Sequence, residues 1–483
     1  MNKQDESVAV GIDNMGRVIF LSTVAAIGGF LFGFDSGVIN GTVGALQSAF
    51  NSDAVGTGFN VASMLLGCAF GAFFAGTLAD KFGRKPVMIA TAVAFIISAW
   101  GSGAAGSSFS FVLARILGGF AVGAASILAP AYISEIAPPR IRGALTTLQQ
   151  LMIVIGLFMA FLSNYSIAGS AGGASGIFLA GHQAWQWMFW VEMIPAGIFL
   201  FCLFFIPESP RYLVSAGRLD QAREVLTSLT NLEDANEKIA DIESTLEKDH
   251  RPRLSDIISK YTGKVHPIIW VGLGLTTLQQ FTGINVVFYY GATLWQAAGF
   301  TEDNALLQNV ISGSVNIVFT FVAIALVDKV GRKPLLMIGG LGQGVMLGIL
   351  ALIFGTAAVS DGGSLMLEGN MGLYALLTAN GYIAFFAFTW GPIMWVMLGE
   401  MFPNQFRGAA LAVCGLIHWG SNFTITMTFP ILLASIGLGF SYGIYAAFGF
   451  IAYFFVKKFV QETKGRTLED MSRDVQTEAP VVV

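Results

Sequence analysis

The chain has 483 residues, of which 12% are charged and 54% are hydrophobic, with a net charge of -4 and a mean hydropathy of +0.68. The charged fraction is about half that of a soluble protein, so the composition indicates an integral membrane protein. The weak charge and the lack of basic runs containing aromatic residues argue against nucleic-acid binding.

The N-terminal segment is polar, and the apolar run after it is too long for the core of a signal peptide, so we expect no cleaved signal. Twelve apolar stretches of about 20 residues, the length that spans a bilayer, are found along the chain. They begin near Val18, Asn60, Val87, Phe111, Leu145, Trp187, Pro267, Leu306, Leu335, Gly372, Ala409 and Gly437. The predicted fold class is an all-α membrane protein with twelve transmembrane helices in two six-helix bundles.

The cationic residues predict the orientation. Of the 26 Lys and Arg residues, all except Arg115 fall on the side of the predicted membrane that holds both termini. Loops on the other side, such as residues 47–58, 165–184 and 356–371, contain no Lys or Arg. Because Lys and Arg accumulate in cytoplasmic loops, we expect both termini in the cytoplasm.

The longest polar stretch, residues 215–264, separates spans six and seven and carries charged residues at helical spacing. We expect short amphipathic cytoplasmic helices there, which act as a solvated linker or as a latch on a cytoplasmic gate. The predicted organisation is a cytoplasmic N-terminus (1–17), an N-terminal six-helix bundle (18–207), a cytoplasmic helical linker (208–264), a C-terminal six-helix bundle (265–459) and a cytoplasmic tail (460–483).

The two halves repeat the same motifs in the same order. The sequence DKFGRKP at 80–86 recurs as DKVGRKP at 328–334, and the run at 207–211 corresponds more loosely to 461–466. An acid and an arginine seven residues apart also occur once in each half, as Glu135 with Arg142 and Glu400 with Arg407. A duplicated half is typical of carriers in which one bundle rocks against the other around a midplane site.

The repeated charged residues lie at the cytoplasmic ends of predicted helices. Exposed ion pairs contribute only ~0–1 kcal/mol each, so a purely stabilising role would be small. We expect them to pair across the two halves when the cytoplasmic side closes. The predicted gate residues are Asp80, Arg84, Glu135, Arg142, Glu208, Arg211, Asp328, Arg332, Glu400, Arg407 and Glu462.

These motifs, with RILGG at 115–119, QQFTGIN at 279–285 and Gly-Pro at 391–392, resemble those of the sugar porter family of the major facilitator superfamily. The chain resembles bacterial proton-coupled xylose and hexose symporters, and it departs from the family at Gln186 and Gln461, where Arg and Pro are usual. The resemblance implies a monomeric secondary active transporter in a bacterial inner membrane. The implied partners are a monosaccharide and protons, with no cofactor beyond the coupling proton.

The same residues argue against other classes of protein. The sequence contains no nucleophile with a neighbouring base and no phosphate-binding loop, so we do not expect an enzyme. The three cysteines lie inside apolar runs and lack the spacing of metal ligands or of a disulfide framework.

Amides inside predicted spans suggest where a sugar binds. A buried amide is costly unless hydrogen-bonded, and a sugar hydroxyl can both donate to it and accept from it. The resemblance implies that Gln279, Gln280 and Asn285 are sugar ligands, and a helix break at Gly283 would bring them together. The full predicted substrate-binding set is Phe32, Gln150, Gln279, Gln280, Asn285, Tyr289, Asn316, Trp395, His418, Trp419 and Asn422. Each amide could instead join neighbouring helices, and each aromatic residue could serve in packing.

Two positions bear on the choice of sugar. His418 stands where the family usually has Gln or Asn, so it could donate to a hydroxyl or be a satisfied neutral histidine. Leu157 stands where a xylose-type porter has Gln and where hexose carriers have an aliphatic residue. This favours a hexose such as glucose or galactose over a pentose such as xylose.

Proton coupling is predicted at Asp35 and Arg115. Asp35 lies about 17 residues into a helix that starts inside, and Arg115 lies a few residues into one that starts outside, so their depths match. An unpaired charge there costs at least ~2.5 kcal/mol, so we expect an ion pair. The resemblance adds that proton-coupled porters have Asp at the position of Asp35. A static salt bridge is the alternative, and Glu192 is a second partner or a structural group.

Two other functions fit the same architecture. A facilitative uniporter is the first alternative to a sugar:proton symporter. The second is a transporter-like sugar sensor, but such sensors usually have long cytoplasmic tails and only about 25 residues follow Lys458.

Overall fold

The computed structural model describes residues 14–230, 232–248, 254–258, 263–359, 365–403 and 405–464. The first half contains α1 (Met15–Val38), η1 (Ile39–Gly41), α2 (Val43–Phe50), α3 (Ala54–Phe82), α4 (Arg84–Gly103), α5 (Ser108–Ile136), α6 (Pro139–Ala171), β1 (Ile177–Leu179), β2 (His182–Gln183), α7 (Ala184–Trp190) and α8 (Met193–Leu203). Four short elements follow: α9 (Pro210–Ser215), α10 (Leu219–Thr227), α11 (Leu232–Lys248) and η2 (Leu254–Ile257). The second half contains α12 (Pro267–Phe281), α13 (Ile284–Ala297), α14 (Glu302–Val330), α15 (Arg332–Thr356), β3 (Ala358–Val359), β4 (Leu365–Met366), α16 (Met371–Phe388), α17 (Trp390–Met401) and α18 (Arg407–Phe459).

The described helices account for twelve membrane crossings. Ten segments are long and apolar enough to span a bilayer by themselves. The longest, α18, has 53 residues and a non-helical Gly437, so it is two spans joined end to end. The remaining crossing is made by α12 and α13 together, each of which is too short alone. Each predicted start lies within six residues of a helix start or of the break at Gly437.

Two of the crossings have a residue with non-helical backbone angles between their two helices. Gly283, between α12 and α13, has φ 84° and ψ 16°, a left-handed conformation that glycine adopts without a steric penalty. The predicted break at this residue is therefore confirmed. The second interruption is at Thr389, between α16 and α17, just before Pro392, which cannot donate a helical hydrogen bond.

Glycines allow very close contacts between helices within each half. In the first half α1 packs on α6 and α3 packs on α5. A Cβ on Gly33 of α1 would lie 1.9 Å from the carbonyl oxygen of Ile153, and one on Gly119 of α5 would lie 1.8 Å from that of Met64. In the second half α15 and α12 pack on α18, and α14 packs on α16.

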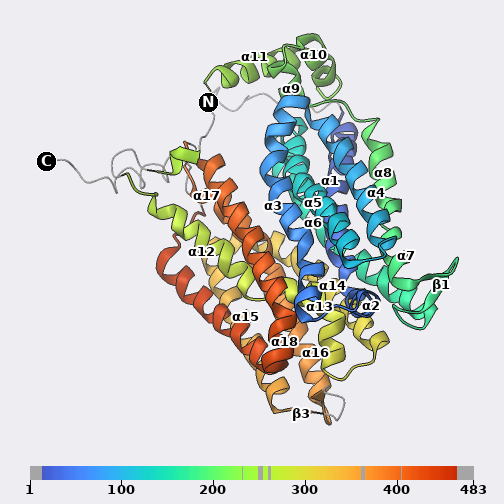
Figure 1. Cartoon of the computed structure of the whole chain (residues 1–483). Coiled ribbons are helices and arrows are strands. Elements are labelled where there is room, and N and C mark those ends of the chain that lie inside the picture. The colour runs from blue at the N-terminus through green and yellow to red at the C-terminus, as the bar shows by residue number, and fades with distance from the viewer. Residues whose placement is uncertain are drawn as a thin grey trace.

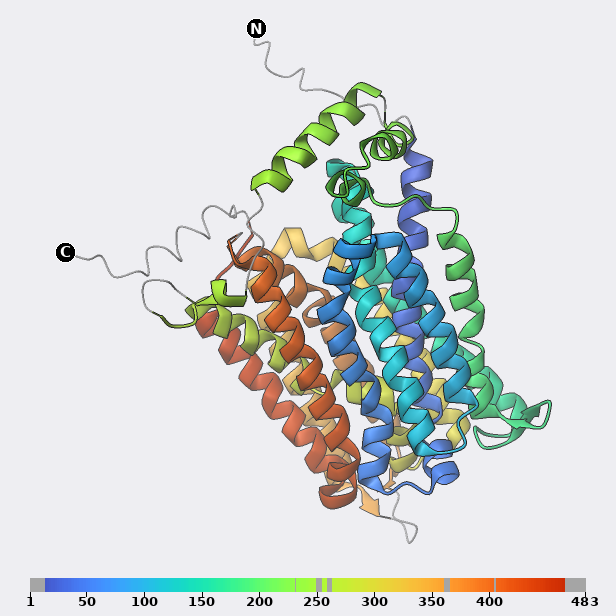
Figure 2. The same ribbon diagram turned by 45° about the horizontal axis from the view of Figure 1, so that its top comes forward.

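The two halves meet along α3 with α18 and along α6 with α14. Figure 1 shows α9, α10 and α11 at one end of the bundle and the strands β1 and β3 at the other, which we call the inner and outer sides. The rotated view in Figure 2 shows the blue and cyan helices of the first half beside the orange and red helices of the second. The two short hairpins pair β1 with β2 and β3 with β4, both antiparallel.

Candidate functional site

A buried ion pair joins α1 to α5. Asp35 and Arg115 are each 1% exposed, and the Arg115 guanidinium binds the Asp35 carboxylate. Arg115 also donates to the backbone carbonyl of Asp35 at 3.1 Å, lies 2.8 Å from the sulfur of Met64, and sits 5.6 Å from the centre of the Phe189 ring. Asp35 and Arg115, for which the sequence predicted similar depths, are therefore in contact.

A second carboxyl belongs to the same cluster. Glu192, between α7 and α8, is 1% exposed and interacts electrostatically with both Asp35 and Arg115. Neither of its oxygens, nor the second oxygen of Asp35, has a hydrogen-bond partner of good geometry among the described residues. Two buried carboxyls therefore face one guanidinium. With both carboxyls ionised, this buried group would have one negative charge in excess, and an uncompensated buried charge is strongly unfavourable.

The amides around the break at Gly283 form a directional chain. Gln279 donates to the carbonyl oxygen of Trp390 at 2.7 Å, Gln280 donates to Gln279 Oε1 at 3.1 Å, and Asn285 donates to Gln280 Oε1 at 2.5 Å. Each amide thereby fixes the orientation of the next. The side-chain carbonyl of Asn285 ends the chain, so the three amides form one ordered row.

Aromatic residues enclose the same amides. The amide nitrogen of Gln280 lies 3.3 Å from Nδ1 of His418, whose ring centre is 5.0 Å from that of Trp395 and 5.3 Å from that of Trp419. Phe32 of the first half lies against Trp419, with ring centres 6.0 Å apart. Trp395 is 40% exposed, whereas His418 and Trp419 are buried.

The remaining predicted ligands form no hydrogen bond to the amide chain in the described part of the structure. Asn422 donates to the Tyr289 hydroxyl at 3.5 Å and accepts from Thr426 at 3.1 Å. Asn316 is buried on α14, and Gln150 is half-buried on α6. Leu157 packs close to Gly37 of α1, so its side chain faces the helix that carries Asp35.

Inner-side charges of the first half are organised around Arg84. Its guanidinium pairs with Glu135 at 3.0 Å and with Asp80 at 2.9 Å. Glu208 accepts from the backbone N–H of Arg84 at 2.9 Å, and the Ser209 hydroxyl donates to Glu135. These contacts tie the start of α4 to the ends of α3 and α5 and to the residues that follow α8.

The second half repeats this arrangement around Arg332. Its guanidinium pairs with Glu400 at 2.7 Å and with Asp328 at 3.0 Å. Glu462 accepts from the backbone N–H of Arg332 at 3.0 Å, and the Thr463 hydroxyl donates to Glu400 at 2.5 Å. The duplication seen in the sequence therefore extends to individual hydrogen bonds.

All of these ion pairs form within one half. The expected pairing across the halves applies to a carrier whose cytoplasmic side is closed, and it stays a prediction. Each arginine begins a helix whose neighbours in its own half supply its carboxylate partners. Arg211 lies on α9, and Arg407 donates to the carbonyl of Phe402 at 3.0 Å in its own half. The side chain of Arg142 lies outside the described part of the structure.

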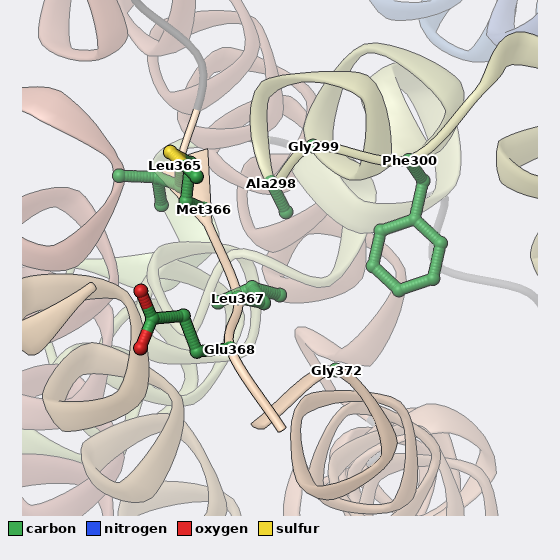
Figure 3. A pocket seen from close by; sticks show the side chains of 8 residues that line it. All are labelled: Ala298, Gly299, Phe300, Leu365, Met366, Leu367, Glu368 and Gly372. Carbon is green, nitrogen blue, oxygen red and sulfur yellow. The ribbon is translucent and has the colours of Figure 1, made fainter. Parts of the chain in front are cut away.

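A cavity of about 390 Å³ lies on the outer side, where α13 and β4 approach the start of α16. Figure 3 shows that the Glu368 carboxylate points away from the Phe300 ring, so the two groups do not converge on one ligand. None of the predicted binding residues lines this cavity.

Sequence reasoning overlooked several buried groups that contact these sites. Met64 and Phe189 complete the surroundings of Arg115, and nothing in their apolar character distinguishes them from packing residues. Asn40 and Asn309 are buried amides that hydrogen-bond across the halves. The cost of burying an amide would have identified both of them.

The comparisons with known proteins agree with this geometry. Residues 21–475 match the model of the family described as sugar (and other) transporter. The chain is 52% identical to a glucose transport protein of Synechocystis sp., covering 95% of this chain and 97% of the relative. It is 39% identical to the D-xylose-proton symporter of Escherichia coli, covering 95% and 96%.

Solved structures of an E. coli protein have the same fold. The partially occluded inward-open form of the xylose transporter XylE gives a TM-score of 0.81 at 36% identity, covering 94% of this chain and all of that one. The proton:xylose symporter XylE bound to 6-bromo-6-deoxy-D-glucose gives 0.76 at 37% identity, covering 95% and 99%.

Proposed function

The chain belongs to the sugar transporter family of the major facilitator superfamily, and on that premise we propose that it imports a monosaccharide together with a proton. A hexose such as glucose is the favoured substrate, and a pentose such as xylose is the second choice. The buried cluster of Asp35, Arg115 and Glu192 is the observation that carries the proton-coupling part of this proposal.

The charge balance of this cluster explains how a proton could control reorientation. With both carboxyls ionised the cluster is one negative charge in excess, and with one proton bound it is neutral. A neutral cluster can be sealed away from water during the passage between states at much lower cost than a charged one. Protonation of Asp35 also weakens its hold on Arg115, because the carboxyl loses its negative charge. The charge of Glu192 then balances that of the guanidinium.

The sugar is proposed to bind at the amide chain and its aromatic neighbours. Hydroxyl groups both donate and accept, which suits the polar ends of Asn285 and Gln280, and the exposed face of Trp395 suits the C–H side of a sugar ring. His418 would supply a further ring nitrogen between the two tryptophans. The 52% identity to a glucose transport protein, against 39% to a xylose symporter, supports the preference for a hexose.

Alternating access is proposed to proceed by motion of the bundle at 18–207 against the bundle at 265–459, with 208–264 as the connecting linker. The TM-score of 0.81 to two inward-open forms supports an inward-facing conformation for this structure. The distribution of Lys and Arg supports termini in the cytoplasm. We place the carrier in the inner membrane of a bacterial cell, as a monomer that needs no cofactor.

Proteoliposomes test this function against its alternatives. The purified chain is reconstituted with a pH-sensitive dye inside, and glucose, xylose and an impermeant polyol are added outside. Acidification of the lumen that depends on glucose supports symport. Uptake of labelled glucose without acidification would establish a uniporter instead, and binding without any uptake would favour a sensor.

A further inference from the structure

The backbone around the break at Gly283 does not bond as a continuous helix does. In an α-helix the N–H of residue 283 would donate to the carbonyl of residue 279. Here the Gly283 N–H donates to the carbonyl of Gln280 at 2.9 Å instead. A buried carbonyl without a donor is costly, so the carbonyls near the break need partners from side chains.

Two side chains supply those donors. The Thr282 hydroxyl donates to the carbonyl of Gln279 at 2.9 Å. The Tyr382 hydroxyl, from α16, donates to the carbonyl of Thr282 at 2.9 Å. Tyr382 is 0% exposed, so its hydroxyl is shielded from bulk water. The break is therefore tied to a neighbouring helix one residue before its left-handed glycine.

The crossing that contains Tyr382 also holds the residues before the break. Trp390 begins α17, directly after the second break at Thr389, and its carbonyl accepts from the Gln279 amide. The Tyr445 ring of α18 lies against Gly283, where a Cβ would be 2.8 Å from a ring atom. Contacts from α16, α17 and α18 therefore constrain the backbone at the break.

The row of amides spans this break, so its geometry depends on the backbone there. Gln280 lies before Gly283 and Asn285 lies after it, and the Asn285 amide donates to Gln280 Oε1 at 2.5 Å. A change of φ or ψ at a hinge moves everything that follows it. A shift at Gly283 would therefore separate these two side chains.

We propose that Tyr382 is a positioning residue for the sugar site, because its hydroxyl fixes the break at Gly283 and so sets the spacing of Gln280 and Asn285. The inference rests on the proposed function, which assigns these amides to the sugar. Tyr382 acts through the backbone of Thr282. Without its hydroxyl the break can adopt other backbone angles, and the sugar must then order the amides at a cost in affinity.

Kinetics with a matched pair of variants test this role. Tyr382→Phe removes the hydroxyl and keeps the ring. Tyr132→Phe is the control, because Tyr132 is also buried and donates to a backbone carbonyl, that of Pro207 at 2.9 Å. Only Tyr382→Phe should raise the apparent KM for glucose, by about fivefold to tenfold, while kcat stays within about twofold. An unchanged KM, or an equal rise in both variants, would overturn the inference.

A combined variant tests whether the hydroxyl acts through the amide row. In Gln280→Ala the central amide is already lost. Adding Tyr382→Phe should therefore change the KM of Gln280→Ala by less than about twofold. A combined KM equal to the product of the two single effects would show that Tyr382 acts independently of the row, and would contradict the proposal.

Hydrogen exchange without sugar separates this inference from the proposed function. In lipid nanodiscs, backbone amides of peptides covering 278–290 should exchange about fivefold faster in Tyr382→Phe than in the parent chain or in Tyr132→Phe. Equal exchange in all three would show that Tyr382 does not fix the break. A parent chain that neither binds nor transports glucose would refute the proposed function without altering this comparison, so the two failures are distinguishable.

Discussion

Glu208 and Glu462 make equivalent hydrogen bonds in the two halves. Each carboxylate accepts from the first backbone N–H of a helix, that of Arg84 at the start of α4 or that of Arg332 at the start of α15. The first N–H groups of a helix have no intrahelical partner, and the positive end of the helix dipole favours an anion there. The acid that caps each helix lies at the C-terminal end of the same half. Each cap therefore joins the end of a half to a helix within that half.

This relationship predicts matched losses of stability. Glu208→Ala and Glu462→Ala should each lower the free energy of unfolding by ~1–2 kcal/mol, because each removes a charged helix cap. Denaturant titration of the purified chain in detergent measures the change. Glu368→Ala, an exposed acid on the outer side, should change it by less than ~0.5 kcal/mol. Equal stability of all three variants would contradict the capping role.

Helix packing predicts a contrast between two glycines. Gly33→Ala should destabilise the fold by ~1–3 kcal/mol or more, because its Cβ would lie 1.9 Å from the Ile153 carbonyl oxygen on the adjoining α6 backbone. Gly44→Ala on α2 meets nothing within 4 Å and should be neutral or stabilising. Thermal unfolding followed by circular dichroism compares them. Similar midpoints for the two variants would show that α1 and α6 are not so closely packed.

Removing the second carboxyl should uncouple the proton from the sugar. Glu192→Gln leaves one carboxyl opposite Arg115, so the cluster is neutral without a bound proton. We expect glucose accumulation driven by a pH gradient to fall by about tenfold or more while glucose exchange at equal pH is retained. Uptake of labelled glucose by proteoliposomes under both conditions gives the comparison. Glu368→Gln is the control, and accumulation that survives in Glu192→Gln would assign Glu192 a structural role only.

The amide chain predicts where sugar affinity is lost. Gln280→Ala removes the central link, which both donates to Gln279 and accepts from Asn285. The apparent KM for glucose should rise by about 10- to 100-fold, equivalent to ~1.4–2.8 kcal/mol. Initial rates of uptake over a range of glucose concentrations measure it. Gln47→Ala on the exposed surface of α2 should leave KM unchanged, and an unchanged KM in Gln280→Ala would place the sugar elsewhere.

The sequence predicted the crossings well because hydrophobic length is a local property. The starts follow from the length of each apolar run, and the depth match of Asp35 with Arg115 follows from counting residues along their two helices. The break at Gly283 was predicted from the glycine that separates the amides of one motif. The break at Thr389 was not predicted, although Gly391 and Pro392 signal it, because the run reads as one apolar stretch.

What could not be predicted depends on contacts between helices. The enclosure of Arg84 and Arg332 by their own halves follows from how neighbouring helix ends meet, which motif spacing does not specify. Glu192 could be recognised as an acid inside a span, but its approach to Asp35 depends on the packing of α8 against α1 and α4. The Asn40 contact joins residues about 250 positions apart, and no local pattern reveals it.

The central claim is that the ion pair of Asp35 and Arg115 couples proton binding to sugar transport. Asp35→Asn has nearly the same shape but no charge and no titratable proton. In proteoliposomes with an inward proton gradient, the parent chain should accumulate glucose above the external concentration. Asp35→Asn should only equilibrate it, while still exchanging labelled for unlabelled glucose. Accumulation by Asp35→Asn equal to that of the parent chain would contradict the account.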